Sequence, residues 1–391
     1  MHLHLQQKIH YLLKSKITEI YLTFALRTFA LSMITIFVPI FLLKQGYGLI
    51  DVAGFFLLKS ILVLLTVKQF LAFAAKKGVK HSIAFSTPFI VAFFVGLHEL
   101  QALQAITGGY GALITLAVLD TVSNLLYYMG FHIDFSKVHT AGKAAKQVSV
   151  LHATSIAFSI IGPFLGAVII TWSSFQTLFA VNAGILFLAI TPLFASGEIH
   201  ETIRMRVKDV FTRKAFKQNL MYYGEGIRFI AAGTYWPVLL YLIAVNLQEI
   251  GGIFTISQAI FAAITIYIGR VSTETNQHHI LKWGAFIQSA SLAVRGFMRT
   301  VALITVAQGL GAISWGMINI PFSAMHYNRS QKHGVTHIIY SREVFLHLGQ
   351  VTSLIIIATL LLAGVPEVTA IILLLLAGAI ATLAMRRITE D

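Results

Sequence analysis

The most constraining feature of the sequence is a series of twelve apolar segments, each close to the length that a helix needs to cross a bilayer. Crossing about 30 Å of hydrocarbon takes about 20 apolar residues in a helix, which also satisfies its own backbone polar groups. The segments cover residues 17–43, 52–75, 82–98, 106–130, 148–171, 175–196, 218–245, 250–270, 282–298, 301–322, 338–363 and 367–385. The sequence therefore predicts an all-α membrane protein with twelve transmembrane helices.

The composition supports this environment and excludes several kinds of chemistry. Hydrophobic residues make up 57% of the 391 residues and charged residues only 11%, unlike an ordinary soluble domain. The chain has no cysteine, which excludes disulfides, thiolate catalysis and cysteine-ligated metals. Neither a metal-ligand cluster nor a phosphate-binding loop is evident in the sequence. We therefore expect no metal ion and no cofactor.

The net charge of +14 is mainly a signal of topology. Most of the 29 lysines and arginines fall in loops on one side of the predicted membrane, and only Lys44, Arg295 and Arg299 fall in loops on the other. The positive-inside rule then places both termini in the cytoplasm. We expect a monomer in a prokaryotic cytoplasmic (inner) membrane, with the lipid bilayer around it and no nucleic-acid partner.

The two halves of the sequence resemble each other. The stretch "GLIDVAGFF" from Gly48 returns as "NLQEIGGIF" from Asn246, at an offset of 198 residues, and the register extends into neighbouring spans. The matched pairs are Pro39 with Pro237, Asp51 with Glu249 and, at a later offset of 195, Asn124 with Asn319 and His152 with His347. Equivalent spans lie six apart and so run in the same direction. This predicts a parallel repeat: a six-helix bundle over 1–196, a cytoplasmic linker over 197–217 that forms a short amphipathic helix, and a second six-helix bundle over 218–391.

With twelve spans in a 6 + 6 parallel repeat and a basic middle loop, the chain resembles the major facilitator superfamily of secondary transporters. Two motifs add to the resemblance. The loop "LAFAAKKGVKHS" matches the family's basic loop, although Ala75 stands where the family has an acid, and "GPFLGA" is similar to the glycine-proline signature of its antiporters. The resemblance implies alternating access, with gating roles for Lys76, Gly78, Lys80, Gly162 and Pro163.

Four ionisable residues are candidates for the chemistry of this protein. Arg27 and Asp120 lie about 15 Å deep by helical rise, where an unpaired charge is costly, so they are candidates for substrate binding or coupling. A structural salt bridge is the alternative. Glu225 and Arg228 share one face of the seventh span, either as a self-contained pair or as partners for other groups. Since Glu225 is the repeat equivalent of Arg27, we also predict that these two pair in one conformational state.

Polar and aromatic residues follow helical spacing along the other spans that the resemblance places around a central cavity. They suit a small organic solute bound by hydrogen bonds and aromatic contacts, although packing between helices explains them equally well. The candidates are Asn124, Tyr127, Tyr235, Gln308, Trp315 and Asn319.

Other polar residues in the spans have simpler interpretations. Lys59 and Lys68 lie near enough to the membrane surface to snorkel. His152 and His347 either hold helix ends or relay protons.

Together these features predict a secondary active transporter of a small organic solute, with protons as the candidate coupling ion in an antiport or efflux mechanism, and not an enzyme. One alternative is a membrane-embedded enzyme, whose best candidate patch is His132, Asp134 and His139. The other is a sensor or lipid-handling protein of the same fold that transports nothing.

Overall fold

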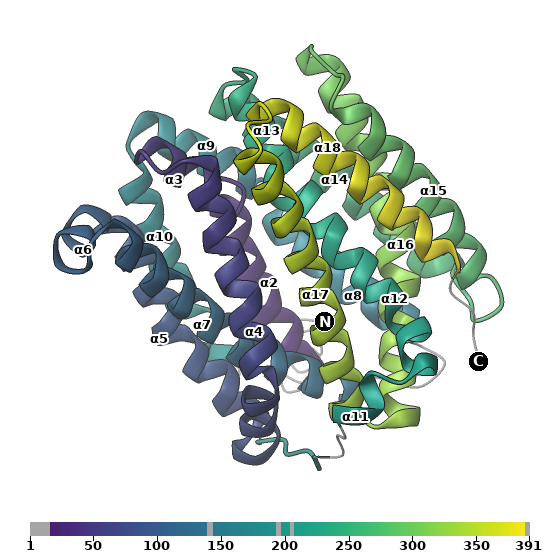
Figure 1. Cartoon of the computed structure of the whole chain (residues 1–391). Coiled ribbons are helices and arrows are strands. Elements are labelled where there is room, and N and C mark those ends of the chain that lie inside the picture. Colours follow the sequence, from purple (N-terminus) through teal and green to yellow (C-terminus); the bar gives the residue numbers. More distant parts are fainter. Residues whose placement is uncertain (1–15, 139–143, 193–196, 204–206, 388–391) are drawn as a thin grey trace, which may run out of the picture.

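The computed structural model describes residues 16–138, 144–192, 197–203 and 207–387, and all regular structure in these ranges is helical (Figure 1). The first half contains α2 (Lys16–Ile34), α3 (Val38–Lys44), α4 (Leu49–Lys77), α5 (Val79–His98), α6 (Leu100–Thr107), α7 (Gly109–Val138), α8 (Ala144–Ser159), α9 (Gly162–Trp172) and α10 (Phe175–Leu188). The second contains α11 (Val207–Val210), α12 (Arg213–Arg228), the π-helix η2 (Phe229–Tyr235), α13 (Trp236–Leu242), α14 (Leu247–Val271), α15 (Gln277–Arg295), α16 (Val301–His333), α17 (Val335–Leu362), α18 (Glu367–Ala384) and the 3₁₀ turn η3 (Met385–Arg387).

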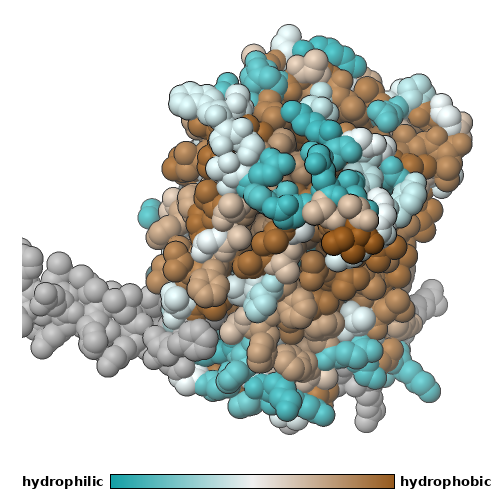
Figure 2. Space-filling view, turned by 90° about the vertical axis from the view of Figure 1, so that its left-hand side faces the viewer, coloured by the Kyte–Doolittle hydropathy of each residue, from teal (hydrophilic) through white to brown (hydrophobic). Residues whose placement is uncertain are grey.

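Nine segments of the described chain are long and apolar enough to cross a membrane. Three predicted spans are not among them. The helix at 175–196 is shortened to α10, the span at 218–245 is divided into α12, η2 and α13, and the segment at 282–298 lies in the more polar α15. On the face shown in Figure 2, apolar residues cover the middle and hydrophilic residues gather at the two ends. The chain is thus a multi-pass integral membrane protein, and the count of twelve spans stays a prediction.

The packing of the helices repeats along the chain. In the first half α5 packs on α7, α4 on α7, α2 on α8 and α10 on α5. The equivalent contacts of the second half are α15 on α16, α14 on α16, α12 on α17 and α18 on α15. The halves meet through another equivalent pair of contacts, α4 with α17 and α14 with both α8 and α9. The sequence repeat is therefore a repeat of structure.

The two similar stretches that reveal the repeat both begin a helix with the same cap. Asp51 accepts a hydrogen bond from the backbone of Gly48 at 2.8 Å, and Glu249 accepts one from the backbone of Asn246 at 3.1 Å. Each acid stands three residues into its helix and satisfies a backbone donor that the helix start leaves open. The acidic position is thus repeated because each half uses it to begin its second spanning helix.

Prolines interrupt the first spanning helix of each half. Pro39 follows the break between α2 and α3, and Pro237 follows η2 at the start of α13. Proline lacks an N–H and displaces the preceding turn, which explains why neither segment is a regular α-helix throughout.

Close packing beside these helices depends on glycine. A Cβ on Gly166 would lie 1.9 Å from the carbonyl oxygen of Met33, and one on Gly349 would lie 2.1 Å from that of Tyr223. Glycine thus lets α9 approach α2, and α17 approach α12.

The segment between the halves differs from its prediction. Residues 197–203 are not helical and lie along the turn between α4 and α5, where Glu201 N donates to Ala75 O and Val79 N donates to Ile199 O, both at 3.0 Å. α11 has only four residues, and α12 begins at Arg213, inside the segment predicted as linker. The predicted amphipathic helix is therefore wrong for residues 197–203, while helical residues of the predicted linker are found in α11 and at the start of α12. The open N–H groups at the start of α5 attract residues 197–203 instead.

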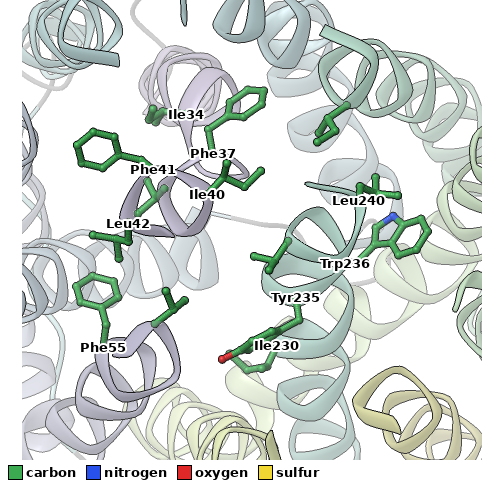
Figure 3. Close-up of a cluster of buried hydrophobic side chains, with 14 of the residues drawn as sticks. Ile34, Phe37, Ile40, Phe41, Leu42, Phe55, Ile230, Tyr235, Trp236 and Leu240 are labelled. Carbon is green, nitrogen blue, oxygen red and sulfur yellow. The ribbon is translucent and has the colours of Figure 1, made fainter. Parts of the chain in front are cut away.

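Apolar side chains join the halves at one end of the bundle. α3 contacts α13 there, and Figure 3 shows the side chains that α2, α3 and α4 contribute on one side and η2 and α13 on the other. The labelled residues are Ile34, Phe37, Ile40, Phe41, Leu42, Phe55, Ile230, Tyr235, Trp236 and Leu240. α11 lies near the opposite end of the bundle (Figure 1).

Candidate functional site

In the first half, a chain of polar contacts crosses three helices between the two ends of the bundle. Arg27 on α2 is buried, with 4% of its surface exposed, and its Nη2 donates to Asn124 Oδ1 on α7 at 3.3 Å. The amide of Asn124 donates to Asp120 Oδ1 at 2.8 Å, and Asp120 forms an ion pair with Lys59 on α4. The Arg27 guanidinium also lies over the ring of Tyr127, 4.0 Å from its centroid. The structure thus brings four of the predicted site residues into one cluster.

Lys59 is the member of this cluster that sequence reasoning missed. Snorkelling was expected for Lys59 and Lys68 of α4, and it agrees with the exposed Lys68. It is wrong for Lys59, which turns toward α7 because the carboxylate of Asp120 offers a closer partner than the membrane surface. The available signal for this ion pair was that the second predicted span contains a basic residue and the fourth an acidic one, since charges inside the membrane tend to pair.

In the second half, Glu225 and Arg228 pair with each other. Arg228 Nε and Nη2 each donate to one carboxylate oxygen of Glu225 at 2.7 Å, and the guanidinium lies 3.8 Å from the ring centroid of Trp315 on α16. Within the described residues no ion pair joins Arg27 to Glu225. The structure therefore has the self-contained pair, and pairing with Arg27 stays a prediction for another state.

The remaining candidates occupy separate places. Asn319 lies 3.3 Å from the Nε2 of His152 and so bridges the halves, and Gln308 donates to Ser257 at 3.1 Å within the second half. Tyr235 is buried in the apolar cluster of Figure 3. None of these three joins the Arg27 cluster through a hydrogen bond that the structure describes.

A polar network that the sequence did not predict crosses the interface toward the other end. His132 of α7 lies 3.0 Å from the Tyr327 hydroxyl on α16 and 3.1 Å from an Arg342 nitrogen on α17. Arg342 pairs with Glu343, whose carboxylate lies 3.7 Å from His347 Nε2. The sequence concealed this network because α16 continues past its predicted end at 322 and carries Tyr327 with it. His132 belongs here, while His139 of the proposed enzyme patch lies outside the described residues.

A small cavity lies beside Arg27. Its lining comes from α2, α5, α7 and the end of the α10 segment, all in the first half, and consists of Thr23, Arg27, Ser86, Thr87, Tyr127, Leu186, Ala189 and Ile190. The cavity is therefore inside one bundle, whereas the sequence resemblance implies a cavity between the two.

The predicted gating motif between α4 and α5 is contacted by a carboxylate from the segment between the halves. The Glu198 carboxylate accepts hydrogen bonds from the backbone N–H groups of Lys80 at 2.8 Å and His81 at 3.1 Å, and it also contacts the His81 ring. Gly78 has a φ of +115°, and a Cβ there would lie 2.4 Å from Glu198. Lys76 contributes its carbonyl oxygen to His200 at 3.1 Å. Glu198 thus provides the carboxylate that the loop lacks at position 75.

These contacts change the acidity of Glu198. Burial alone would raise its pKa, but hydrogen bonds from the Lys80 and Ile199 backbone and from His81 stabilise the charged form, and the net effect is a lowered pKa. The carboxylate therefore remains ionised at neutral pH.

The second gating motif packs two helices together. Gly162 and Pro163 begin α9 directly after the break in the fifth spanning segment. A Cβ on Gly162 would lie 1.9 Å from the Ser32 hydroxyl, so glycine is required for the approach of α9 to α2. In the described part of the chain, no cluster of three or more histidine, cysteine or acidic residues is arranged to hold a metal.

The comparisons with known proteins identify the fold. No family model matches the chain, and no curated protein does. The human organic anion transporter MFSD10 (TETRAN) is similar in structure, with a TM-score of 0.60 and 13% identity over 94% of this chain and 98% of that one. A bacterial homologue of the iron transporter ferroportin, in an outward-facing state, has a TM-score of 0.67 and 15% identity over 96% of this chain and 98% of its own. The chain is an α-helical membrane protein with the major facilitator fold, as its sequence predicted.

Proposed function

We propose that this protein is a secondary active transporter, not an enzyme, and that it moves a small organic solute across the membrane by alternating access. The observation that carries the proposal is that the two halves, packed alike, meet through different contacts at the two ends of the bundle. Apolar side chains join α3 to α13 at one end, and the His132 network joins α7 to α16 and α17 at the other. Two separable contacts, with charged clusters between them, suit a protein that opens one end at a time.

The fold of the solved neighbours supports a transporter, although their solutes do not transfer to this chain. The charge distribution of the sequence supports cytoplasmic termini, and with them an outward-facing end at α3 and α13.

Coupling to protons is a further part of the proposal. The ion pair of Lys59 with Asp120 is its best candidate site, because protonation of Asp120 would release Lys59.

A test of transport does not need the solute to be known. Proteoliposomes containing the full chain are loaded with a defined mixture of amino acids, organic acids, sugars and nucleosides, and the retained solutes are measured by mass spectrometry. We expect one chemical class to leave faster than from protein-free vesicles. A proton gradient should change that rate, and Asp120→Asn should remove the gradient's effect.

Cysteine pairs at the two ends test alternating access directly. Ser330 donates to Ser136 at 3.2 Å across the halves, and the Lys44 amine lies 5.9 Å from the Tyr241 ring centroid at the other end. Because the chain has no native cysteine, S136C/S330C and K44C/Y241C each contain only the two introduced thiols, which a cleavable bifunctional thiol reagent can join. Either crosslink should stop the solute loss reversibly, while K68C treated in the same way should not. Solute loss that continues with both ends crosslinked, or no loss of any solute, would refute the proposal.

A further inference from the structure

The buried charges between the two ends of the bundle do not balance. Both acids of the two charged clusters are already taken, Asp120 by Lys59 and Glu225 by Arg228. Arg27 has no carboxylate partner among the described residues and is held by a neutral amide and an aromatic ring. Arginine cannot lose its proton in a protein, so this positive charge persists at a depth where it is costly.

The other buried arginine without an acidic partner in the described chain has a local explanation. Arg295 is the last residue of α15, where the open carbonyl groups at a helix end favour a positive charge. Arg27 lies in the interior of α2 and has no such helix end beside it. Among the described residues, Arg27 is therefore the buried arginine that has neither an acidic partner nor the end of its own helix beside it.

The Nε and Nη2 edge of the Arg27 guanidinium is only partly used for hydrogen bonds within the described residues. Tyr127 covers a face of the group, and Asn124 takes Nη2 through a long hydrogen bond of 3.3 Å. Nε is buried without a hydrogen-bond partner. Arg228 shows what such an edge accepts, because it is stacked in the same way on Trp315 and its Nε and Nη2 edge holds the two oxygens of Glu225. A carboxylate fits this fork of donors.

The walls of the cavity beside Arg27 suit a molecule with a charged head and an apolar body. Thr23, Ser86 and Thr87 bring hydroxyl groups to it, and the Thr23 hydroxyl is buried without a partner. Leu186 and Ile190 add apolar surface to the same lining. The cavity is small, so binding a solute there requires the helices around it to move apart.

We propose that the transported solute is an organic anion whose carboxylate or phosphate head binds Arg27 in this cavity, inside the first half. This inference rests on the proposed transport function, because it names the solute that is transported. Binding of an anion at Arg27 can be tested without transport. The alternative is that Glu225 leaves Arg228 and neutralises Arg27 in another state, in which case the cavity needs no anion.

Thermal unfolding of the purified full chain, followed by tryptophan fluorescence, measures binding. The probes are matched in shape and differ in charge: benzoate, phenyl phosphate, benzamide and benzylamine, and then hexanoate and hexanamide, all at constant ionic strength. We expect one or both anion types to raise the unfolding midpoint in a saturable way and the amides and the amine to leave it unchanged. Equal stabilisation by an acid and its amide would overturn the proposal.

Variants locate the site. Arg27→Gln should weaken anion binding by about 10-fold or more, because it removes charge-assisted hydrogen bonds, and Arg27→Lys should fall between it and the parent, since it keeps the charge without the fork. Arg270→Gln removes an exposed arginine at the end of α14 and should bind like the parent. If Arg27→Gln does not fold, Thr23→Val provides a milder test and should also weaken binding. Unchanged anion affinity in a folded Arg27→Gln, or in Thr23→Val if that variant replaces it, contradicts the site.

The solute-loss assay separates this inference from the transport proposal. If only neutral or cationic solutes leave the vesicles, transport stands and the anion inference fails. If anions bind through Arg27 but no solute crosses, the site stands and transport fails.

Discussion

Removing the Glu225 carboxylate should destabilise the protein strongly. Glu225→Gln keeps the shape of the side chain but replaces two charge-assisted hydrogen bonds to Arg228, both 2.7 Å long. The two side chains are only 9% and 10% exposed, so water cannot compensate the remaining charge. Breaking a buried ion pair from one side typically costs about 3–5 kcal/mol, and the intact stacking on Trp315 places the expected value in the lower part of that range.

The double variant Glu225→Gln/Arg228→Gln separates the pair from the rest of the protein. Removing both charges leaves no buried ion uncompensated, so most of the lost stability should return, with a coupling of about 2–3 kcal/mol between the two positions. A second double-mutant cycle, which combines Glu225→Gln with Arg27→Gln, is the control. Because Arg27 makes its contacts within the first half, these two changes should add to within about 0.5 kcal/mol.

Reversible unfolding in mixed micelles, titrated with SDS and followed by tryptophan fluorescence, measures each corner of both cycles. The reasoning fails if Glu225 couples to Arg27 as strongly as to Arg228. That result would mean that the predicted pair across the halves, and not the self-contained pair, is dominant under the conditions of the experiment.

Three further predictions follow from the packing, the linker and the topology. Gly166→Val should prevent α9 from lying against the backbone of Met33, and the variant should lose its compact fold in size-exclusion chromatography; a normal elution profile would contradict the contact. Glu198→Gln should loosen the segment at 197–203, measured by amide hydrogen exchange. Because the pKa of Glu198 is lowered, the parent protein should keep this contact above its usual value of 4.5 and lose it as the pH falls further through the folded-state pKa, while the variant shows no such acid-dependent change. Lys208→Cys should react with impermeant reagents only from the cytoplasm and Lys44→Cys only from outside, and the reverse pattern would overturn the orientation.

Much of the fold follows from features that act locally. Apolar length predicts helices, and the repeat is visible because Asp51 and Glu249 begin equivalent helices and Pro39 and Pro237 interrupt equivalent ones. Each of these residues acts within a few positions of its own place in the chain. A single sequence is therefore sufficient to recognise them.

The partners of the site residues could not be predicted in the same way. Lys59 and Asp120 meet only because α4 and α7 are rotated so that these side chains face each other, and hydropathy contains no information about that rotation. Glu198 packs against the turn between α4 and α5, where Gly78 has no Cβ to block it, and this contact joins residues 118 positions apart in the chain. Helical rise predicts a depth for Arg27, and this depth stays a prediction, whereas the stacking of Arg27 on Tyr127 required the packed structure.

The two halves repeat their packing but not the charges at the positions of Arg27 and Asp120, and this difference has a physical consequence. At the position of Arg27 the second half has Glu225, and at the position of Asp120 it has Trp315. The second half therefore contains both an arginine and the carboxylate that neutralises it, whereas the first half gives its only clustered acid to Lys59. Similar packing in the halves makes two arrangements of similar energy possible, and a ligand shifts such an equilibrium only if it binds one arrangement better. An anion has that preference if the Nε edge of Arg27 is more accessible in one arrangement, because Arg27 is held by a neutral amide and an aromatic ring and has no acidic partner among the described residues.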